Sequence, residues 1–274
     1  SIFFIFIIYG CSNPAEQDGD KTEKSFSHSI TLKTIPAKHK AKVLKYFKEF
    51  VKNRNFNGQL LVAKGNTIIF DTTTGYANIK KRIPLKENSA IQLASITKPI
   101  TATILLQLVE EGKLSVSDTI TKFLPNLPKH YSSITIEHLL AHRSGLAQYY
   151  YYCDALIENK QELIYNDTVL CAINFHNPNH YFKPGKQHNY CNTNYLLLAS
   201  IIEAIERKSY PSIVKKRIFD PCKMDDSFVI DIKKDTFPSN LTLGHSLNNK
   251  VFKLDYLDGV VGDKGIFSST RDLF

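Results

Sequence analysis

Residues 94–111 read ASITKPITATILLQLVEE. From Ile96 onward the apolar side chains fall on nearly every face of a helix, which is typical of a helix buried in a protein core. Gly112 follows directly and suits the left-handed position at a helix C-terminus. We therefore expect Ser95 to begin a central helix, with Lys98 one turn further along the same face. The free N–H groups at this helix start would stabilise an oxyanion formed when Ser95 Oγ attacks a carbonyl.

The pattern Ser-x-x-Lys occurs twice, and its second copy runs from Ser212 to Lys215. An isolated copy is usually an ordinary helix N-cap followed by a surface lysine. That interpretation fits Ser212, which follows a proline and begins an amphipathic helix with exposed cationic side chains. It does not fit Lys98, which would lie on a helix with little exposed surface. Burial disfavours the charged amine, so Lys98 is predicted to act as a base.

A second motif, Tyr190-Cys191-Asn192, lies far downstream. It offers a phenol that can transfer a proton and a carboxamide that can bind substrate. If the segment is extended, Cys191 points away from its two neighbours, because side chains alternate along a strand. Tyr-x-Asn also occurs twice, and the other copy is Tyr76-Ala77-Asn78. Order and context must therefore separate the site from its chance copy.

Both motifs belong to a longer ordered set of short segments. The set consists of Phe56–Gly58, Gly75–Asn78, Ala94–Pro99, Leu139–Leu146, Phe182–Gly185, Tyr190–Tyr195, Pro221–Met224 and Gly265–Leu273. Together these segments resemble the serine β-lactamase and D-alanyl-D-alanine peptidase superfamily, closest to its class C and esterase-like branch. Each segment is weak alone, but their order is specific. The resemblance also assigns Tyr76–Asn78 to a structural strand end.

The resemblance implies that Ser95 forms an acyl-enzyme with an amide, lactam or ester carbonyl. Lys98 would take the serine proton directly or through Tyr190, and Tyr190 would protonate the leaving group. Asn192 would bind the substrate amide and orient Lys98. The prediction is thus catalytic Ser95, Lys98 and Tyr190 with substrate-binding Asn192, and no cofactor or metal.

The resemblance also implies a third motif, Lys-Thr-Gly or His-x-Gly, on a strand beside the nucleophile. The chain lacks this third motif. The chain also begins inside an apolar run, without a Met. We therefore expect a fragment truncated at both ends, without its C-terminal strands. Such a fragment would be a poor catalyst, because one oxyanion donor is worth about 10²–10³ in rate.

Strands near both ends with helices between them predict an α+β, β-lactamase/transpeptidase-like fold. Residues 28–90 and 240–274 would form an antiparallel sheet subdomain. Residues 91–239 would form a mostly helical subdomain inserted between these two segments. The active site would lie in the cleft between them. Periodicity and turn signals predict helices at 37–51, 95–111, 136–141, 161–175, 194–207 and 210–219, strands at 59–63 and 67–70, and a hairpin over 241–257 turning at 248–249.

The N-terminus carries an unbroken apolar run from Ile2 to Ile8. It is shorter than the ~20 residues that span a bilayer, and it suits the hydrophobic region of a signal peptide. Gly10-Cys11 then resembles a bacterial lipobox, and residues 12–27 are polar, as in a flexible tether. We expect Cys11 to be lipidated, which would anchor the protein to the membrane in a bacterial cell envelope, facing the periplasm or exterior. The alternative is a chance cysteine after a signal peptide.

The other cysteines and the histidines carry weaker signals. Cys153, Cys171, Cys191 and Cys222 show no metal-ligand spacing. One pair, such as Cys153 with Cys171, could form a disulfide in an oxidising compartment, and Cys191 is expected to be structural. His138 and His142 share a helical face, but a zinc-protease motif needs glutamate where Leu139 stands. We expect His142 to satisfy backbone groups in a turn.

The formal net charge is +9, yet the lysines are dispersed and no aromatic–basic recognition motif occurs. We therefore do not expect a nucleic-acid partner. Three functions remain open: a cell-envelope serine hydrolase acting on peptidoglycan stem peptides or esters, a true class C-like β-lactamase, and a non-catalytic binding or sensing lipoprotein. The four site residues favour a hydrolase, because a binding module has no need of all of them.

Overall fold

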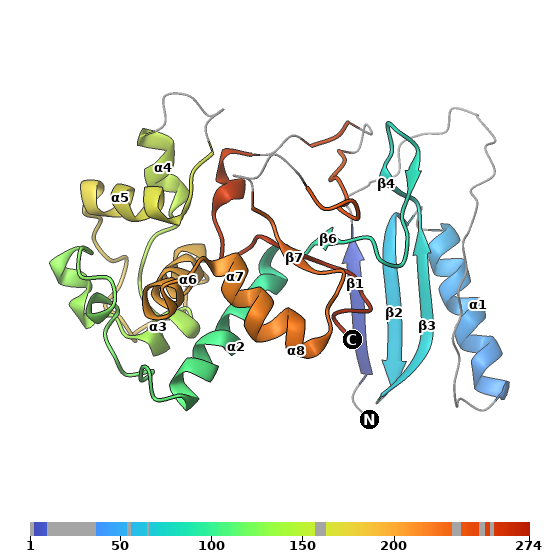
Figure 1. Cartoon of the computed structure of the whole chain (residues 1–274), viewed down its shortest axis with the longest axis horizontal. Coiled ribbons are helices and arrows are strands. Elements are labelled where there is room, and N and C mark those ends of the chain that lie inside the picture. Colours follow the sequence, from blue (N-terminus) through green and yellow to red (C-terminus); the bar gives the residue numbers. More distant parts are fainter. Residues whose placement is uncertain are drawn as a thin grey trace.

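The computed structural model describes residues 3–9, 37–53, 56–64, 66–156, 163–231, 237–246, 250–252 and 255–274. A sheet with one flanking helix forms one end of the molecule and a group of helices forms the other (Figure 1). The strands are β1 (Phe3–Tyr9), β2 (Gly58–Lys64), β3 (Thr67–Thr74), β4 (Tyr76–Asn78), β5 (Ile83–Pro84), β6 (Ile91–Gln92), β7 (Phe228–Val229) and β8 (Ile266–Ser268). The helices are α1 (Ala37–Asn53), α2 (Thr97–Glu110), α3 (Ile136–Leu140), α4 (Tyr150–Leu156), α5 (Asn166–His176), α6 (Asn192–Glu206), α7 (Tyr210–Val214) and α8 (Asp220–Cys222).

The larger sheet has the order β1-β2-β3, and both strand pairs are antiparallel. Leu60 and Val62 alternate along β2 and pack with Phe70 of β3 against the apolar face of α1. Phe47 of α1 stacks on Phe70 with ring centroids 5.1 Å apart. The predicted amphipathic helix and the β2–β3 hairpin are therefore confirmed, since the apolar face of α1 is buried against these two strands.

The apolar run at the N-terminus forms β1, which pairs with β2 from Phe3 opposite Lys64 to Tyr9 opposite Gly58. The segment that the sequence suggests as a signal-peptide region thus lies as a strand in this structure. Cys11 and the polar residues 12–27 lie outside the described residues, so the lipobox stays a prediction. None of the described helices combines the length and apolar character needed to cross a bilayer.

The helical part packs around α2 and α6, which lie against each other beside α3 and α7. Ten consecutive residues of α6, from Thr193 to Ile202, are buried. The prediction that this helix is buried on every face is wrong: Leu106 of α2 is 47% exposed, and Ile96, directly before α2, is 45% exposed. Its buried face is Thr97, Lys98, Thr101, Ile104, Leu105 and Leu108. Lys98 therefore lies on the face that the core covers.

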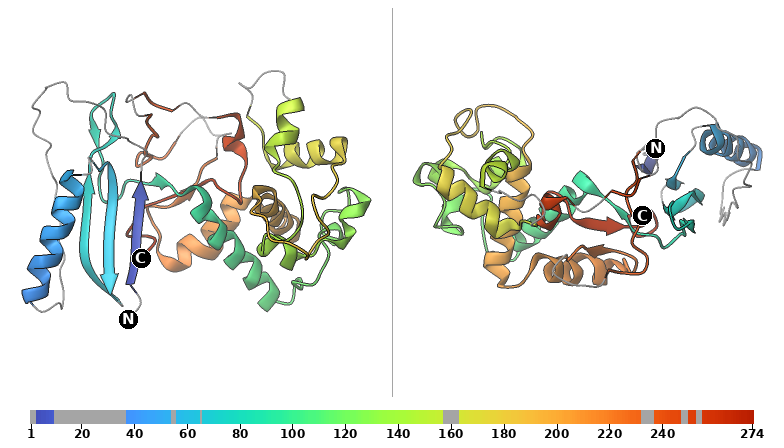
Figure 2. Two further views of the ribbon diagram at one scale, coloured as in Figure 1. Left: turned by 180° about the vertical axis from the view of Figure 1, so that it is seen from behind. Right: turned by 90° about the horizontal axis from the view of Figure 1, so that it is seen from above.

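A second small sheet, in the order β6-β8-β7, connects the two parts of the molecule (Figure 2). β8 comes from the C-terminal region and pairs with β6 just before Ser95. Gln59 of β2 reinforces this connection, because its Oε1 accepts a hydrogen bond of 3.0 Å from the Thr270 N–H. Arg271 adds an ion pair with Asp71 of β3 at 2.6 Å. The terminal regions therefore do combine, as the fold class predicts, although β8 does not join the larger sheet.

Two local predictions differ from the structure. In the predicted hairpin over 241–257, the described residues hold one antiparallel bridge, His245 with Val251, and a short helical turn at Tyr256–Gly259. The predicted turn at 248–249 lies outside the described residues. The helix predicted from residue 161 begins at Asn166. Among the described residues no disulfide forms, so the Cys153–Cys171 pairing is not found.

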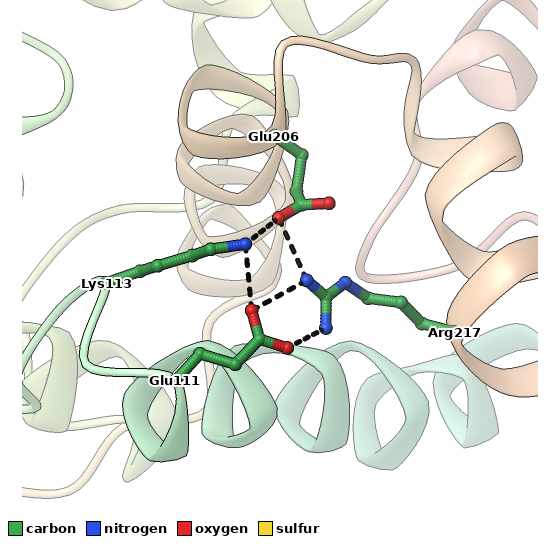
Figure 3. A network of polar contacts seen from close by, with 4 residues as sticks. All are labelled: Glu111, Lys113, Glu206 and Arg217. Atoms are coloured by element: carbon green, nitrogen blue, oxygen red, sulfur yellow. Dashed lines mark hydrogen bonds and ion pairs between the residues drawn. The ribbon is translucent and has the colours of Figure 1, made fainter.

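An ionic cluster of Glu111, Lys113, Glu206 and Arg217 joins the ends of α2 and α6 to the helical segment after α7 (Figure 3). The Arg217 guanidinium forms two hydrogen bonds to Glu111, of 2.6 and 3.0 Å, and one of 2.9 Å to Glu206. Hydrogen bonds from Arg217 and Lys113 lower the pKa of Glu111 to about 2. The cluster thus joins the C-terminal ends of α2 and α6 to the helical segment after α7.

We expect Glu111→Gln to destabilise the protein modestly at neutral pH, by about 1 kcal/mol or less, because Glu111 is partly exposed. The folded-state pKa of Glu111 lies below its ordinary value, so its contribution is full above pH 4.5 and is lost as the pH falls toward 2. Urea unfolding at pH 6 and pH 3 measures this. The matched control is Glu110→Gln, an exposed neighbour, which should change neither value. An equal effect of Glu111→Gln at both pH values would contradict the account.

Candidate active site

Ser95 lies in a short 3₁₀ turn, Ala94–Ile96, that runs directly into α2. The turn follows β6, and the Leu93 N–H donates a 2.9 Å hydrogen bond to the Ile266 carbonyl of β8. Ala94 has a φ of 47°, a left-handed conformation that costs a non-glycine residue energy. This sharp turn leaves Ser95 exposed while the first turn of α2 enters the core.

Three hydrogen bonds define the centre of the site. Lys98 Nζ donates to Ser95 Oγ at 3.0 Å and to the Asp263 carbonyl at 2.9 Å. Ser95 Oγ also shares a 2.7 Å hydrogen bond with the Tyr190 hydroxyl. The structure therefore brings together Ser95, Lys98 and Tyr190 as the sequence predicts. The serine hydroxyl lies between two groups that can accept or relay its proton.

The three side chains differ in exposure. Lys98 is 5% exposed and Tyr190 is 44% exposed. The Lys98 amine also lies over aromatic rings, 5.0 Å from the Tyr190 centroid and 5.8 Å from that of Tyr195. Ring faces attract a cation, so this enclosure accommodates the charge that the amine carries after it takes a proton. Ser95 is thus exposed, whereas the amine of Lys98 is enclosed.

Gln148 fixes the segment that carries Tyr190, a role that sequence reasoning missed. Its Nε2 donates to the Tyr190 carbonyl at 3.1 Å, and its Oε1 accepts from the Asn192 N–H at 2.9 Å. Cys191, between them, is 1% exposed and its thiol contacts the Ala147 carbonyl at 3.4 Å. The structural role predicted for Cys191 is thus confirmed. A glutamine pairing with a backbone across a loop leaves no periodic sequence signal.

Asn192 is the first residue of α6, and its role differs in one respect from the prediction. Its Oδ1 is buried without a hydrogen-bond partner among the described residues. The hydrogen bonds of Lys98 go to Ser95 and Asp263, and Asn192 is not among them. The predicted orientation of Lys98 by Asn192 is therefore not found. An unpaired buried acceptor is costly, which suits a group that binds a substrate N–H.

His142 also supports the segment that carries Tyr190. Its Nδ1 accepts from the Cys191 N–H at 3.1 Å, and its ring lies 4.5 Å from the Tyr190 ring. Burial, the Lys98 charge and the His188 charge together lower the pKa of His142 to about 4. His142 is thus a neutral acceptor at physiological pH. Its predicted role of satisfying backbone groups is confirmed, but the group belongs to the Tyr190 segment and not to its own turn.

The remaining candidates do not join the site. Ser212 is exposed on α7, and Tyr76–Asn78 forms β4. The Nδ1 of His138 accepts from the Thr135 N–H at the start of α3. Within the described ranges no cluster of three potential metal ligands occurs. Cys11 lies outside those ranges.

A family model described as Beta-lactamase matches residues 43–274, which is most of the chain. The chain belongs to the Beta-lactamase family. Among curated members, penicillin-binding protein 4* of Bacillus subtilis (strain 168) is 33% identical over 246 residues, which cover 83% of this chain and 53% of the relative. Teichoic acid D-alanine hydrolase of Staphylococcus aureus (strain MRSA252) is 28% identical over 229 residues, which cover 82% of this chain and 54% of the relative.

A solved structure agrees with this assignment to the Beta-lactamase family. The penicillin-binding protein from Bacillus halodurans superposes with a TM-score of 0.71 at 26% identity, covering 83% of this chain and 70% of that one. The chain spans about half the length of the curated relatives it matches. The superfamily and the α+β fold predicted from the ordered motifs are confirmed.

We expect His142→Asn to keep the fold, because asparagine tolerates the φ of 54° at this position and offers an acceptor near the place of Nδ1. The folded-state pKa of His142 lies below that of the unfolded chain, so its neutral form contributes stability above pH 6.5 that is lost as the pH falls toward 4. The variant should lose less stability than the native chain between pH 7 and pH 5. Imidazole ¹⁵N shifts that give a His142 midpoint near 6.5 would contradict this.

Proposed function

We propose that the protein is a serine hydrolase that forms an acyl-enzyme on Ser95. The observation that carries the proposal is the position of Ser95 Oγ, 3.0 Å from Lys98 Nζ and 2.7 Å from the Tyr190 hydroxyl. A nucleophile within hydrogen-bond reach of an amine and a phenol is the arrangement that acyl transfer requires. Membership of the Beta-lactamase family supports the same chemistry.

In the proposed reaction Ser95 Oγ attacks a carbonyl and its proton passes to Lys98, directly or through Tyr190. The carbonyl oxygen becomes an oxyanion, which the Ser95 N–H at the start of the helix can bind. Tyr190 is exposed beside the nucleophile, so it can donate a proton to the departing group. Water then attacks the acyl-enzyme, and the serine regains its proton. Asn192 Oδ1, buried and unpaired in this structure, accepts a hydrogen bond from the substrate amide.

We propose that the substrates are D-alanyl peptides or esters of the cell envelope. Two relatives support this: one is named a penicillin-binding protein and the other a teichoic acid D-alanine hydrolase. One name refers to penicillin and the other to the D-alanine of teichoic acid, and the Ser95–Lys98–Tyr190 arrangement suits attack on a carbonyl of either an amide or an ester. The basic net charge of +9 would favour approach to an anionic polymer.

Covalent labelling tests the hydrolase proposal. We expect a fluorophosphonate and a fluorescent penicillin each to add to Ser95 of the purified protein, as peptide mass spectrometry would show. Ser95→Ala should remove the adduct, and Lys98→Ala should slow its formation by about 10²–10⁴-fold, because the base is lost. The matched controls are Ser212→Ala and Lys215→Ala in the second Ser-x-x-Lys copy, which should label like the native protein. No adduct from either reagent would favour a non-catalytic binding protein.

The fate of the penicillin adduct distinguishes the classes of hydrolase. A lasting adduct is expected for a peptidase, rapid turnover for a β-lactamase, and labelling by the fluorophosphonate alone for an esterase. All three outcomes keep Ser95 as the nucleophile.

We also propose that the protein is a lipoprotein of a bacterial cell envelope, anchored through Cys11. The support is the apolar run Ile2–Ile8 followed by Gly10-Cys11 and a polar tether. When the protein is expressed in bacterial cells, Cys11→Ser should move it from the membrane fraction to the soluble fraction. Cys222→Ser, which removes an exposed cysteine, should leave it with the membrane. A Cys11→Ser protein that stays membrane-bound would contradict the proposal.

A further inference from the structure

A basic pocket lies in the helical part of the molecule, outside the Ser95 site, and the proposed mechanism does not use it. Its volume is about 680 Å³, and none of the residues that line it is acidic. Its polar side chains are those of His130, Ser133, Asn179, His180, Lys183 and Lys186. Both lysines are exposed, and the part of the chain that the structure describes gives neither of them an ion pair. Their charges are therefore available to a ligand.

The sequence around the pocket is also one-sided in charge. No Asp or Glu occurs between Asp167 and Glu203, a stretch that contains both of these lysines and Tyr190. Arg143 adds a further cation, because its guanidinium donates a hydrogen bond to the Gly185 carbonyl of the same loop. Cations without neighbouring carboxylates attract an anionic ligand and raise its local concentration.

Two histidines of the pocket lie against each other, with ring centroids 5.3 Å apart. His130 Nε2 lies 2.9 Å from the Pro178 carbonyl, so this nitrogen carries a proton. His180 Nε2 is buried without a hydrogen-bond partner among the described residues. Burial, followed by the charge of His130, lowers the pKa of His180. His180 thus has unused hydrogen-bonding capacity, and an anion beside it would favour its charged form.

The loop that lines the pocket runs directly into the active site. The Asn189 N–H donates a 2.9 Å hydrogen bond to the His142 carbonyl, which fixes the end of the loop beside the histidine that supports Tyr190. Tyr190 follows Lys186 by four residues, so their Cα atoms lie within about 14 Å of each other. An extended ligand can therefore occupy the pocket and reach the nucleophile at the same time.

We propose that this pocket binds a phosphate group of an anionic cell-envelope polymer whose ester or amide carbonyl is attacked by Ser95. A phosphate has several acceptor oxygens, which the lysines, the histidines, Ser133 and Asn179 can meet together, whereas a single carboxylate has fewer. The ligand is an extended chain, because no residue lines both the pocket and the Ser95 site. The pocket holds the polymer and takes no part in bond making. The inference rests on the proposed hydrolase function and names its substrate class.

Inorganic phosphate tests the pocket without catalysis. We expect added phosphate to raise the NMR titration midpoint of His180, assigned with His180→Gln, by about half a pH unit or more at constant ionic strength. Lys183→Gln combined with Lys186→Gln should weaken phosphate binding about tenfold, because charge-assisted hydrogen bonds are lost. The matched control, Lys208→Gln combined with Lys216→Gln, removes the same charge from exposed positions and should leave the affinity unchanged.

Hydrolysis provides a second readout. The substrates are a D-alanyl ester of a short glycerol phosphate oligomer and the D-alanyl ester of glycerol, which has no phosphate. Lys183→Gln combined with Lys186→Gln should raise the KM of the phosphate-bearing ester about tenfold and leave its kcat unchanged, because the pocket lies outside the reacting atoms. Both constants for the uncharged ester should stay as in the native protein.

The outcomes separate this proposal from the hydrolase function. An unchanged His180 midpoint in phosphate, an equal shift in acetate, or an equal loss of affinity in the control variant overturns the pocket proposal, while labelling of Ser95 would still support the hydrolase. Phosphate binding at His180 in a protein that no reagent labels would support the pocket and contradict the hydrolase function.

Discussion

The amine of Lys98 is enclosed in the core at the start of α2, and much of the structure around it serves to satisfy that amine. A buried amine needs hydrogen-bond partners, because it has lost its water. Ser95 Oγ supplies one acceptor from the same helix turn, and the Asp263 carbonyl supplies another from the C-terminal region. Tyr190 and Tyr195 add ring faces at 5.0 and 5.8 Å. One side chain thus requires three distant segments to meet.

The segments around β8 and Tyr190, which supply these partners of Lys98, are each held by contacts with other elements. β8 lies between β6 and β7. Gln59 and Arg271 join the residues that follow β8 to the larger sheet. Gly262 allows the segment that precedes β8 to approach α6 closely. On the other side, Gln148 and His142 hold the backbone of the Tyr190 segment. The ionic cluster around Arg217 joins the ends of α2 and α6 to the helical segment after α7 (Figure 3). Rigid support of this kind is what places reacting atoms within hydrogen-bond distance.

The contrast in exposure at the centre bears on function. Ser95 and Tyr190 face solvent, whereas Lys98 and Asp263 are enclosed. A substrate can therefore reach Ser95 and Tyr190, while the amine of Lys98 stays out of water, where electrostatic interactions are stronger. The Oδ1 of Asn192 is buried beside them without a hydrogen-bond partner among the described residues.

The sequence by itself determined the family, the α+β class, the positions of α1, β2 and α6 to within two residues, the start of β3, and the set of Ser95, Lys98 and Tyr190. These follow from local periodicity and from motifs whose residues are close in sequence. Only the tertiary structure decided that Gln148 and His142 hold the Tyr190 segment, that β8 pairs with β6, and that the Asp263 carbonyl accepts a hydrogen bond from Lys98. Each of these contacts joins residues far apart in the chain through a side chain or carbonyl that has no period. A sequence pattern reports the local structure that neighbouring residues can form. The partners of the buried Lys98 amine include residues far away in the chain, and only the packing of the core decides which residues these are.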